Sequence, residues 1–513
     1  VYNFQNGSGP GSFSFQALPG ATGVSNAALP LLNFFEGNAY SVSRSVLLSA
    51  YYFERSEPSA YIQDSWRVMP WLTVNMGIRY DIFTPYIDAS GNQQFSCFDS
   101  KRATLLTANE NGVSPTCNVN TDYGSLAPRF GFAASLGHDT VLRGGYALVY
   151  FNDQTGPLYP FLNPPLYNTY SPNVLTVGLS TPLPLPSQQA VAASRYGIDP
   201  NFKNSRANQV NVNLQHAFKG TVVSVGYVGS FVRALRIVPN INLALPQPPP
   251  LNSYVTRRPY YNLLPNVTGI YMVSSFGATN YDAMLTTVEH RLSHGLTFIG
   301  SYTWGHSTGD YQSYSTGGTY NSAIPWQYGK LEWGNTDLDI RQRFSLMLNY
   351  ALPFGSTLTG WKGAALKGWH FNAIAVYQTG SPFSVLNSAA LSNTGVSSDR
   401  PNVVGNFNLP NPTINEWFNP AAFAPQAIGT IGSEGRNILT GPRFRHLDCS
   451  IFKDFRFQER YTLQTRFEAF NITNTPNFAL PNATLGTTTI GTITSTRSGS
   501  TPRDLQFALR FSF

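Results

Sequence analysis

The stretch RDLQFALRFSF, residues 503–513, decides the fold class. Apolar residues recur at every second position along it, namely Leu505, Phe507, Leu509, Phe511 and Phe513. The positions between them carry polar, charged or small side chains. Because successive side chains of a strand point to opposite faces, this pattern predicts a β-strand with one wholly apolar face. Such a strand needs an apolar environment along one side.

The same alternation recurs through most of the chain. In WLTVNMGIRYDI (71–82) and in YTLQTRFEAF (461–470), apolar and polar residues again take turns. We expect about fourteen strands of roughly 10–15 residues each, longer than ordinary strands, and no helix. The expected strands lie at 41–54, 59–68, 71–82, 128–137, 139–151, 206–218, 220–231, 279–292, 295–306, 338–352, 367–379, 442–457, 461–470 and 502–513.

The connections between these strands are short and long in turn. Short turns follow the strands at 59–68, 128–137, 206–218, 279–292 and 442–457. Long loops rich in Gly, Pro, Asn and Ser occupy 83–127, 152–205, 232–278, 307–337, 380–441 and 474–501. Lipid offers no hydrogen-bond partner to the backbone, so only helices and closed sheets cross a membrane, and this arrangement is typical of the closed sheets.

The sequence therefore predicts an all-β fold, an antiparallel transmembrane β-barrel with short periplasmic turns and long extracellular loops. Tyr80, Tyr150, Tyr302, Trp304 and Tyr377 lie near strand ends, where aromatic girdles belong. A soluble sandwich or propeller would instead have shorter strands and a repeat of about 40–50 residues, which we do not find.

Composition agrees with a membrane barrel and excludes several other classes. Charged residues make up 12% of the chain, against about 25% in ordinary soluble domains. The net charge is +7 without any run of Lys or Arg, so nucleic acid is not an expected partner. No apolar run of 18 or more residues is present, which excludes a transmembrane helix.

Few residues carry the spacing of a catalytic or metal site. The seven His are dispersed, and no nucleophile elbow, P-loop or CxxC motif is present. We therefore expect neither an enzyme nor a metal or other cofactor. Cys97 and Cys117 lie in one loop and form either a disulfide or two unpaired thiols; the sequence leaves both open.

Charged residues on the polar faces of the strands are expected to face the lumen of the barrel. They suit ion pairs, contacts to something inside the barrel, or simple exposure to water. These residues are Arg79, Arg143, Arg341, Arg343, Arg466, Glu468 and Arg510.

Several stretches together resemble one family. SAYIQDSWRVMPWLTVNMGIRYD (59–81) resembles the barrel signature of TonB-dependent outer-membrane receptors, in particular their Oar-like (carboxypeptidase-regulatory-like) branch. The other stretches that resemble this branch are LAPRFGFA (126–133), VLRGGYALVYF (141–151), DIRQRFSLMLNYALPFG (339–355), SDRPNVVG (398–405), NPAAFA (419–424), GRNILTGPRFRHLDCSIFKDFRF (435–457), RFEAFNITNTPNF (466–478) and PRDLQFALRFSF (502–513).

This resemblance implies that the chain is the C-terminal part of a longer receptor. Family barrels have about 22 strands and an N-terminal plug inside. We expect residues 1–40 to be a remnant of the upstream barrel region and residues 41–513 to be the C-terminal strands. The implied function is the binding and passage of a bulky substrate across the outer membrane, energised by the TonB complex through an upstream plug.

The resemblance also implies partners and an assembly signal. Outer-membrane lipid surrounds such barrels, and the barrel assembly machinery reads a C-terminal aromatic strand, here Phe507, Leu509, Phe511 and Phe513. Substrate contact is expected from aromatic residues of the long loops, Tyr311, Tyr314, Trp326 and Trp333, which suit either sugars and peptides or packing of loop against loop. The alternatives are a self-contained passive channel of about fourteen strands and a structural or adhesive outer-membrane protein.

Overall fold

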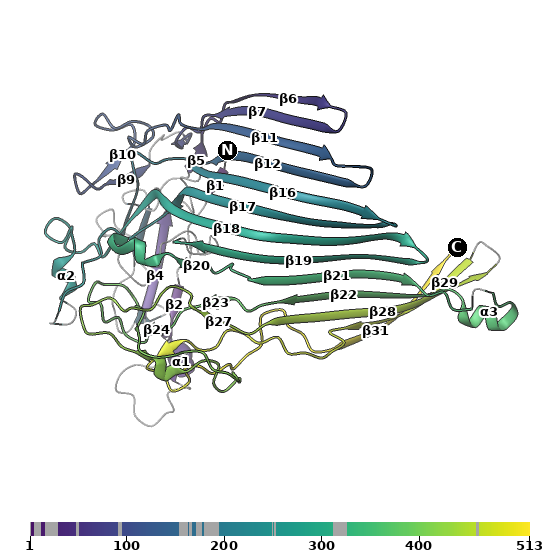
Figure 1. The fold of residues 1–513 in the computed structure, drawn as a ribbon. Coiled ribbons are helices and arrows are strands. Elements are labelled where there is room, and N and C mark those ends of the chain that lie inside the picture. Colours follow the sequence, from purple (N-terminus) through teal and green to yellow (C-terminus); the bar gives the residue numbers. More distant parts are fainter. Residues whose placement is uncertain are drawn as a thin grey trace.

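Long antiparallel strands, laid side by side in chain order, form the main sheet of the computed structural model (Figure 1). The structure describes residues 2–4, 12–15, 29–39, 41–47, 51–90, 95–152, 163, 167–170, 177–178, 194–248, 250, 253–310, 326–355, 357–457 and 461–513. The sheet has fifteen strands, of which β15 and β20 lie off its continuous path, leaving thirteen along it.

The thirteen strands run in space from the first to the last in sequence order. They are β6 (Ser59–Met69), β7 (Leu72–Asp81), β11 (Leu126–Ser135), β12 (Thr140–Phe151), β16 (Ser205–Phe218), β17 (Thr221–Ile237), β18 (Gly269–Ser293), β19 (Leu296–Gly309), β21 (Gln342–Ala351), β22 (Trp369–Gln378), β28 (Phe444–Phe457), β29 (Tyr461–Phe470) and β31 (Asp504–Ser512). Each corresponds to a strand expected from the sequence, so the all-β, antiparallel prediction is confirmed. β17 and β18 are longer than expected because both continue into the loop region.

Shorter elements surround the main sheet. The further strands are β1 (Tyr2–Phe4), β2 (Ser12–Ser14), β3 (Asn38–Ala39), β4 (Ser41–Leu47), β5 (Tyr51–Glu54), β8 (Ile87–Asp88), β9 (Ser96–Asp99), β10 (Thr104–Thr107), β13 (Tyr167–Tyr170), β14 (Val177–Gly178), β15 (Ser194–Ile198), β20 (Gly334–Asn335), β23 (Pro382–Phe383), β24 (Leu386–Asn387), β25 (Asn402–Val403), β26 (Phe423–Ala424), β27 (Leu439–Thr440) and β30 (Thr484–Leu485). The helices are α1 (Leu29–Glu36), α2 (Tyr254–Arg257), α3 (Gly360–Leu366) and the 3₁₀ turns η3 (Trp326–Glu332) and η4 (Pro420–Ala422).

Two expectations about elements were wrong. The strand expected at 41–54 is not in the main sheet, since β4 pairs with β2 and β13 while β5 pairs with β1 and β8. The expectation of no helix overlooked the short helices, which the alternating pattern of the strands does not reveal. None of the helices described is both long enough and apolar enough to cross a membrane.

The strand register divides the main sheet into an apolar and a polar face. Residues directly opposite on neighbouring strands share a face. One row across β19, β21, β22, β28, β29 and β31 is polar throughout and consists of Thr297, Asn349, Asn372, Ser450, Glu468 and Gln506. The adjacent row on the other face is apolar throughout and consists of Phe298, Leu348, Ala373, Cys449, Ala469 and Leu505.

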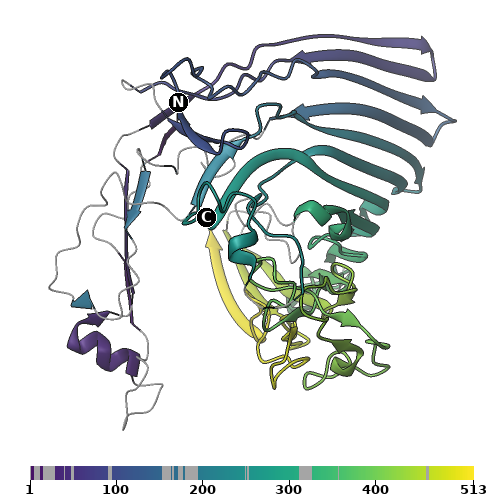
Figure 2. The same cartoon turned by 90° about the vertical axis from the view of Figure 1, so that its left-hand side faces the viewer.

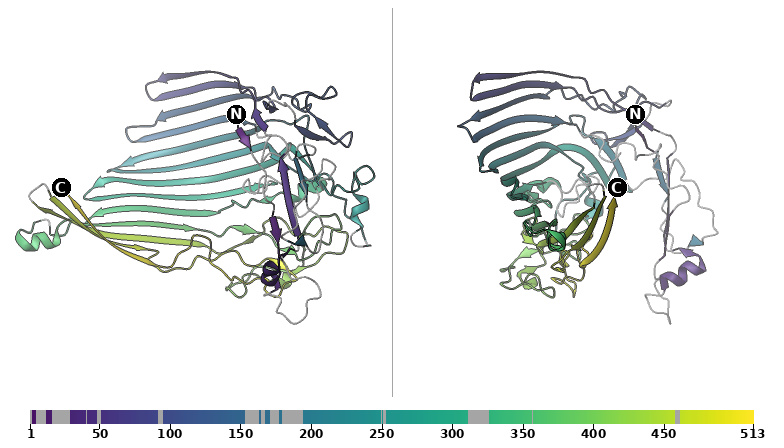
Figure 3. Two further views of the ribbon diagram at one scale, coloured as in Figure 1. Left: turned by 180° about the vertical axis from the view of Figure 1, so that it is seen from behind. Right: turned by 90° about the vertical axis from the view of Figure 1, so that its right-hand side faces the viewer.

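The main sheet curves from β6 to β31 (Figures 2 and 3). Among the described residues β6 and β31 are its two edges and are not paired with each other. Every pairing along the thirteen-strand path is antiparallel. The first and last strands of an odd-numbered antiparallel path run in the same direction, so β6 and β31 both run from the long-loop end to the short-turn end.

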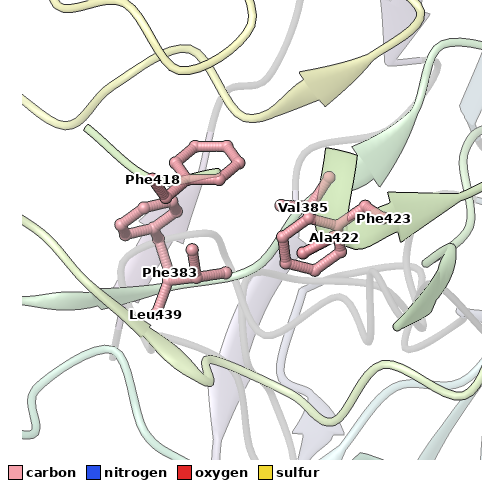
Figure 4. Close-up of a cluster of buried hydrophobic side chains, with 6 residues drawn as sticks. All are labelled: Phe383, Val385, Phe418, Ala422, Phe423 and Leu439. Atoms are coloured by element: carbon pink, nitrogen blue, oxygen red, sulfur yellow. The ribbon is translucent and has the colours of Figure 1, made fainter. Parts of the chain in front are cut away.

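The long loops have a core of their own. Six buried side chains from loop 380–441 form it (Figure 4), and they are Phe383, Val385, Phe418, Ala422, Phe423 and Leu439. β23 pairs with β27 and β25 pairs with β26 around this core. The loop is therefore a packed layer at one end of the sheet.

Candidate functional site

Four long loops meet around a pocket of about 670 Å³ at the long-loop end of the sheet. This volume lies within the usual range of small-molecule sites. The lining residues are 97–102, 106, 117–118, 198–201, 239, 241, 259–260, 272, 274, 276 and 327. Loops 83–127 and 232–278 supply most of the wall, whereas the aromatic residues expected to contact substrate all belong to loop 307–337.

A disulfide braces one wall of the pocket. Cys97 and Cys117 are bonded, with their Cα atoms 6.5 Å apart, which was one of the two alternatives that the sequence left open. Both are buried in a small apolar cluster with Phe53, Phe95 and Ala108. β9, which carries Cys97, pairs with β10, so the disulfide ties this hairpin to the segment after it.

Aromatic packing forms a second wall. The rings of Phe98 and Tyr260 meet edge to face at 5.7 Å between centroids. The hydroxyl of Tyr260 donates a hydrogen bond to the carbonyl oxygen of Ser100 at 3.0 Å, which joins loop 232–278 to the hairpin. Burial, and secondly the nearby carboxylate of Asp99, raise the pKa of Tyr260. The phenol is therefore a neutral hydrogen-bonding group at physiological pH.

The N-terminal part of β18 forms the third wall. Met272, Ser274 and Phe276 line the pocket from this strand. β15 pairs with β18 in parallel from Ser194 opposite Gly269 to Ile198 opposite Val273. The pocket is thus built directly on a strand of the main sheet.

The rim of the pocket carries charges of both signs. The Asp99 carboxylate accepts hydrogen bonds from the backbone N–H groups of Lys101, at 2.8 Å, and Arg102, at 3.2 Å. The side chains of Lys101 and Arg102 are exposed. The lining described includes no His. This arrangement suits binding of a molecule with both apolar and polar parts.

Of the four aromatic residues expected to contact substrate, Trp333 is described in full and does not line this pocket. Tyr311 and Tyr314 lie outside the described residues. Trp326 begins η3, and Trp333 follows η3 with a side chain that is 42% exposed. Gln327, in the same turn, is the residue of this loop that lines the pocket.

The charged residues expected in the lumen share the polar face of the sheet wherever they lie in strands. Arg143 and Arg343 belong to one row of opposed residues, which passes through Asn213, Gly226, Leu285 and Thr303. By the strand register, Arg79, Arg466, Glu468 and Arg510 lie on this polar face as well. Arg341 lies just before β21, where its Nε donates to Asp339 at 2.7 Å and its guanidinium contacts His306 at 2.8 Å.

Several of these charges are bonded to neighbours on the polar face. Arg79 forms an ion pair with Asp81 at 2.8 Å, and Arg466 pairs with Glu468 at 3.4 Å. Arg143 donates to the Gln215 side chain at 2.8 Å.

The C-terminal residues Phe507, Leu509, Phe511 and Phe513 are exposed, and the first three share the apolar face.

No group of three or more His, Cys, Asp or Glu side chains is placed to hold a metal ion within the described part of the chain.

A family model described as "Outer membrane beta barrel domain" matches residues 1–506. The match covers nearly the whole chain, so the protein belongs to this family of outer-membrane β-barrels. Its place is the cell outer membrane, and the family is one of membrane barrels and not of enzymes. A search of the curated proteins found no match.

Solved structures of outer-membrane receptors are similar to this chain. The ferric-catecholate import receptor Fiu of Escherichia coli K12 is 13% identical, with a TM-score of 0.41, over 92% of this chain and 45% of that one. The pyoverdine receptor FpvA of Pseudomonas aeruginosa is 10% identical, with a TM-score of 0.43, over 92% and 43%. A mutant of the ferric enterobactin receptor PfeA of the same organism is 12% identical, with a TM-score of 0.43, over 92% and 46%. The chain spans less than half the length of these proteins.

Proposed function

We propose that the chain is part of a TonB-dependent receptor of the Oar-like branch, which captures a bulky substrate at its long loops and passes it across the outer membrane. The pocket at the junction of four long loops carries this proposal. It stands on β18, a strand of the main sheet, at the end opposite the short turns. The family stretches of the sequence supply the resemblance to this branch.

The open sheet supports a larger barrel than these strands form. β6 and β31 run in the same direction, so they cannot complete an antiparallel barrel by pairing with each other. An odd number of additional strands would give the even number usual in bacterial barrels and would satisfy both edges in lipid. We propose that such strands close the barrel, with the polar face, including Arg79, Arg143 and Arg343, toward the lumen.

The same proposal includes the partners expected from the resemblance. Lipid covers the apolar face, the barrel assembly machinery reads the C-terminal strand that ends in Phe513, and the TonB complex supplies energy through a plug. A self-contained passive channel or an adhesive protein would need no TonB. Substrate uptake that persists undiminished in cells lacking TonB would therefore contradict the energised mechanism.

Two substitutions test the pocket. Phe276→Ala and Lys101→Glu alter lining side chains that are exposed, so folding and membrane levels should be preserved. We expect either variant, in the full receptor, to retain at least tenfold less of the molecule that co-purifies with the wild type, a loss of about 1.4 kcal/mol. Native mass spectrometry of protein from the producing cells measures this.

Trp333→Ala is the matched control. Trp333 is an exposed loop aromatic that does not line the pocket. If Trp333→Ala abolishes binding while Phe276→Ala and Lys101→Glu do not, substrate contact belongs to the aromatic residues expected from the sequence and the pocket assignment fails.

A further inference from the structure

The connection between β21 and β22 differs from the tight turns at the same end of the sheet. Residues 352–368 fill it and include α3, whereas β6–β7 and β16–β17 are joined by two residues each. The segment contains Lys362 and Lys367 but no Asp or Glu. α3 lies beyond the strand ends, away from the long loops (Figures 1 and 3).

The helix buries a glycine and exposes large apolar side chains. A Cβ on buried Gly363 would stand 2.5 Å from the carbonyl oxygen of Leu358, so the helix packs closely on that side. Trp361 is two residues away, on nearly the opposite side of the helix, and is 77% exposed. Phe354 is 57% exposed, and Leu366 is exposed as well.

Two side chains fix the end of the helix to the sheet. The indole Nε1 of Trp369 donates to the carbonyl oxygen of Ala365 at 3.1 Å. The ammonium group of Lys453 donates to the carbonyl oxygen of Lys367. These bonds satisfy carbonyl groups that the end of a helix leaves without partners. The exposed side chains are thus held in place relative to the sheet.

The position of Lys453 links α3 to the apolar face. Lys453 is opposite Trp369 and Thr465, which puts it on the same apolar face as Phe467. Its side chain is nevertheless buried. Its Nζ lies 5.3 Å from the ring centroid of Trp369 and 4.9 Å from that of Phe455. A cation here is sheltered by rings and a carbonyl group, and it ties the helix to the apolar face.

Aromatic residues mark the membrane boundary at this end. Tyr350 is opposite Phe371 on the apolar face. This pair is the second from the end of β21, directly before the connection that contains α3. Tyr461 on β29 and Phe511 on β31 stack with their ring centroids 5.9 Å apart. Aromatic bands of this kind lie at the junction of lipid and water. α3 ends three residues before Trp369, so it lies next to this aromatic band.

We propose that residues 352–355 and 357–368 bind the headgroup layer of an anionic phospholipid membrane at the short-turn end. Trp361, Phe354 and Leu366 enter the boundary of the acyl chains, and Lys362 and Lys367 pair with lipid phosphates. Lys362 Nζ lies 5.7 Å from the ring centroid of Trp361, so a cation stands beside the exposed indole ring. This inference depends on membrane insertion and not on the proposed receptor function.

A fluorescent label measures the depth of α3. The full-length receptor with Cys449→Ser and Ala365→Cys, labelled with a nitrobenzoxadiazole dye, is inserted into vesicles of phosphatidylcholine and phosphatidylglycerol. We expect nitroxide on the lipid headgroups to quench the dye at least threefold more than in Asn408→Cys, a control in an exposed long loop. Aqueous iodide should quench the Asn408 label more strongly. Equal iodide quenching at both positions would overturn the proposal.

The charges of the lipid and of the two lysines provide a second test. With both lysines present, the headgroup quenching should increase with the phosphatidylglycerol fraction, and Lys362→Gln with Lys367→Gln should remove that increase. An increase that persists in this double variant would overturn the pairing with phosphate. If Ala365→Cys disturbs insertion, Ala364→Cys gives the same measurement at the neighbouring exposed position.

Discussion

Glu434 is a carboxyl group buried within loop 380–441. Its Oε1 accepts a hydrogen bond from the backbone N–H of Val385 at 2.8 Å. Burial raises its pKa to about 8, although this hydrogen bond and the charge of Arg400 act in the opposite direction. The folded loops therefore prefer the protonated acid, whereas the unfolded chain titrates near the ordinary carboxyl value.

The sign of the pH dependence follows from this raised pKa. The stability that Glu434 contributes is complete below the unfolded pKa and is lost as pH rises through about 8. We expect hydrogen-exchange protection of loop 380–441 to fall between pH 5 and 9 (roughly, the range that brackets both values), and Glu434→Gln to flatten this fall. Glu416→Gln, an exposed carboxyl in the same loop, should leave it unchanged. Identical profiles for both variants would contradict the assignment to Glu434.

A charge on the apolar face provides a second test at the scale of the residue. Phe467 is opposite Phe507 and Ile451 on the apolar face. Gln464, three residues earlier in the same strand, lies on the polar face, where its side chain bonds to Asp454. We expect Phe467→Arg to cost about 2–4 kcal/mol of unfolding free energy in lipid vesicles if it lies near the midplane. Gln464→Arg should cost far less. Equal costs in denaturant titrations would invalidate the division into faces.

Alternation predicts the face of most strand residues, and it fails where packing between elements decides. Met347 and Ile374 are opposite each other on the polar face and half exposed, although both are apolar. The register puts Lys453 on the apolar face, where Lys367, 86 residues away in sequence and directly after α3, offers it a carbonyl group. Neither arrangement is visible within a single strand.

At the scale of the element, the β9–β10 hairpin depends on its disulfide. The bond closes a loop with a sequence separation of 20, which in the chain-entropy account contributes about 3 kcal/mol. We expect Cys97→Ser with Cys117→Ser to speed tryptic cleavage after the exposed Lys101 and Arg102. Cleavage within the main sheet should not change. Unaltered cleavage after Lys101 would show that the hairpin holds without the bond.

Strands were easier to predict than the site. A period of two repeats over ten or more residues, so the bounds of β12 and β16 follow the sequence within a residue or two. α3 has only seven residues, too few for a helical period to emerge. The pocket was missed because its walls come from four loops, and contacts such as Phe98 with Tyr260 join residues far apart in sequence.

At the scale of the whole molecule, the two open edges allow a direct test. Gln63 on β6 and Gln506 on β31 both have the parity of the polar face. We expect no disulfide between Gln63→Cys and Gln506→Cys under mild oxidation of the full-length receptor in membranes, because further strands separate them. As a positive control, Glu468→Cys with Gln506→Cys should cross-link, since these residues are opposed on paired strands. Efficient cross-linking of Gln63→Cys to Gln506→Cys would mean that the sheet closes on itself.

The length of β18 separates capture from passage. This strand has 25 residues, and Met272 in the pocket lies seven residues before Thr279, where pairing with β19 begins. At about 3.3 Å per residue, the pocket stands roughly 20 Å outside the point at which the full sheet forms. In the proposed receptor, a molecule held there would still be in the surrounding medium and would travel that height before it meets the barrel. Arrival from the medium and descent toward the membrane would then be two separate steps, with rates that substitutions in the pocket and in the sheet should alter independently.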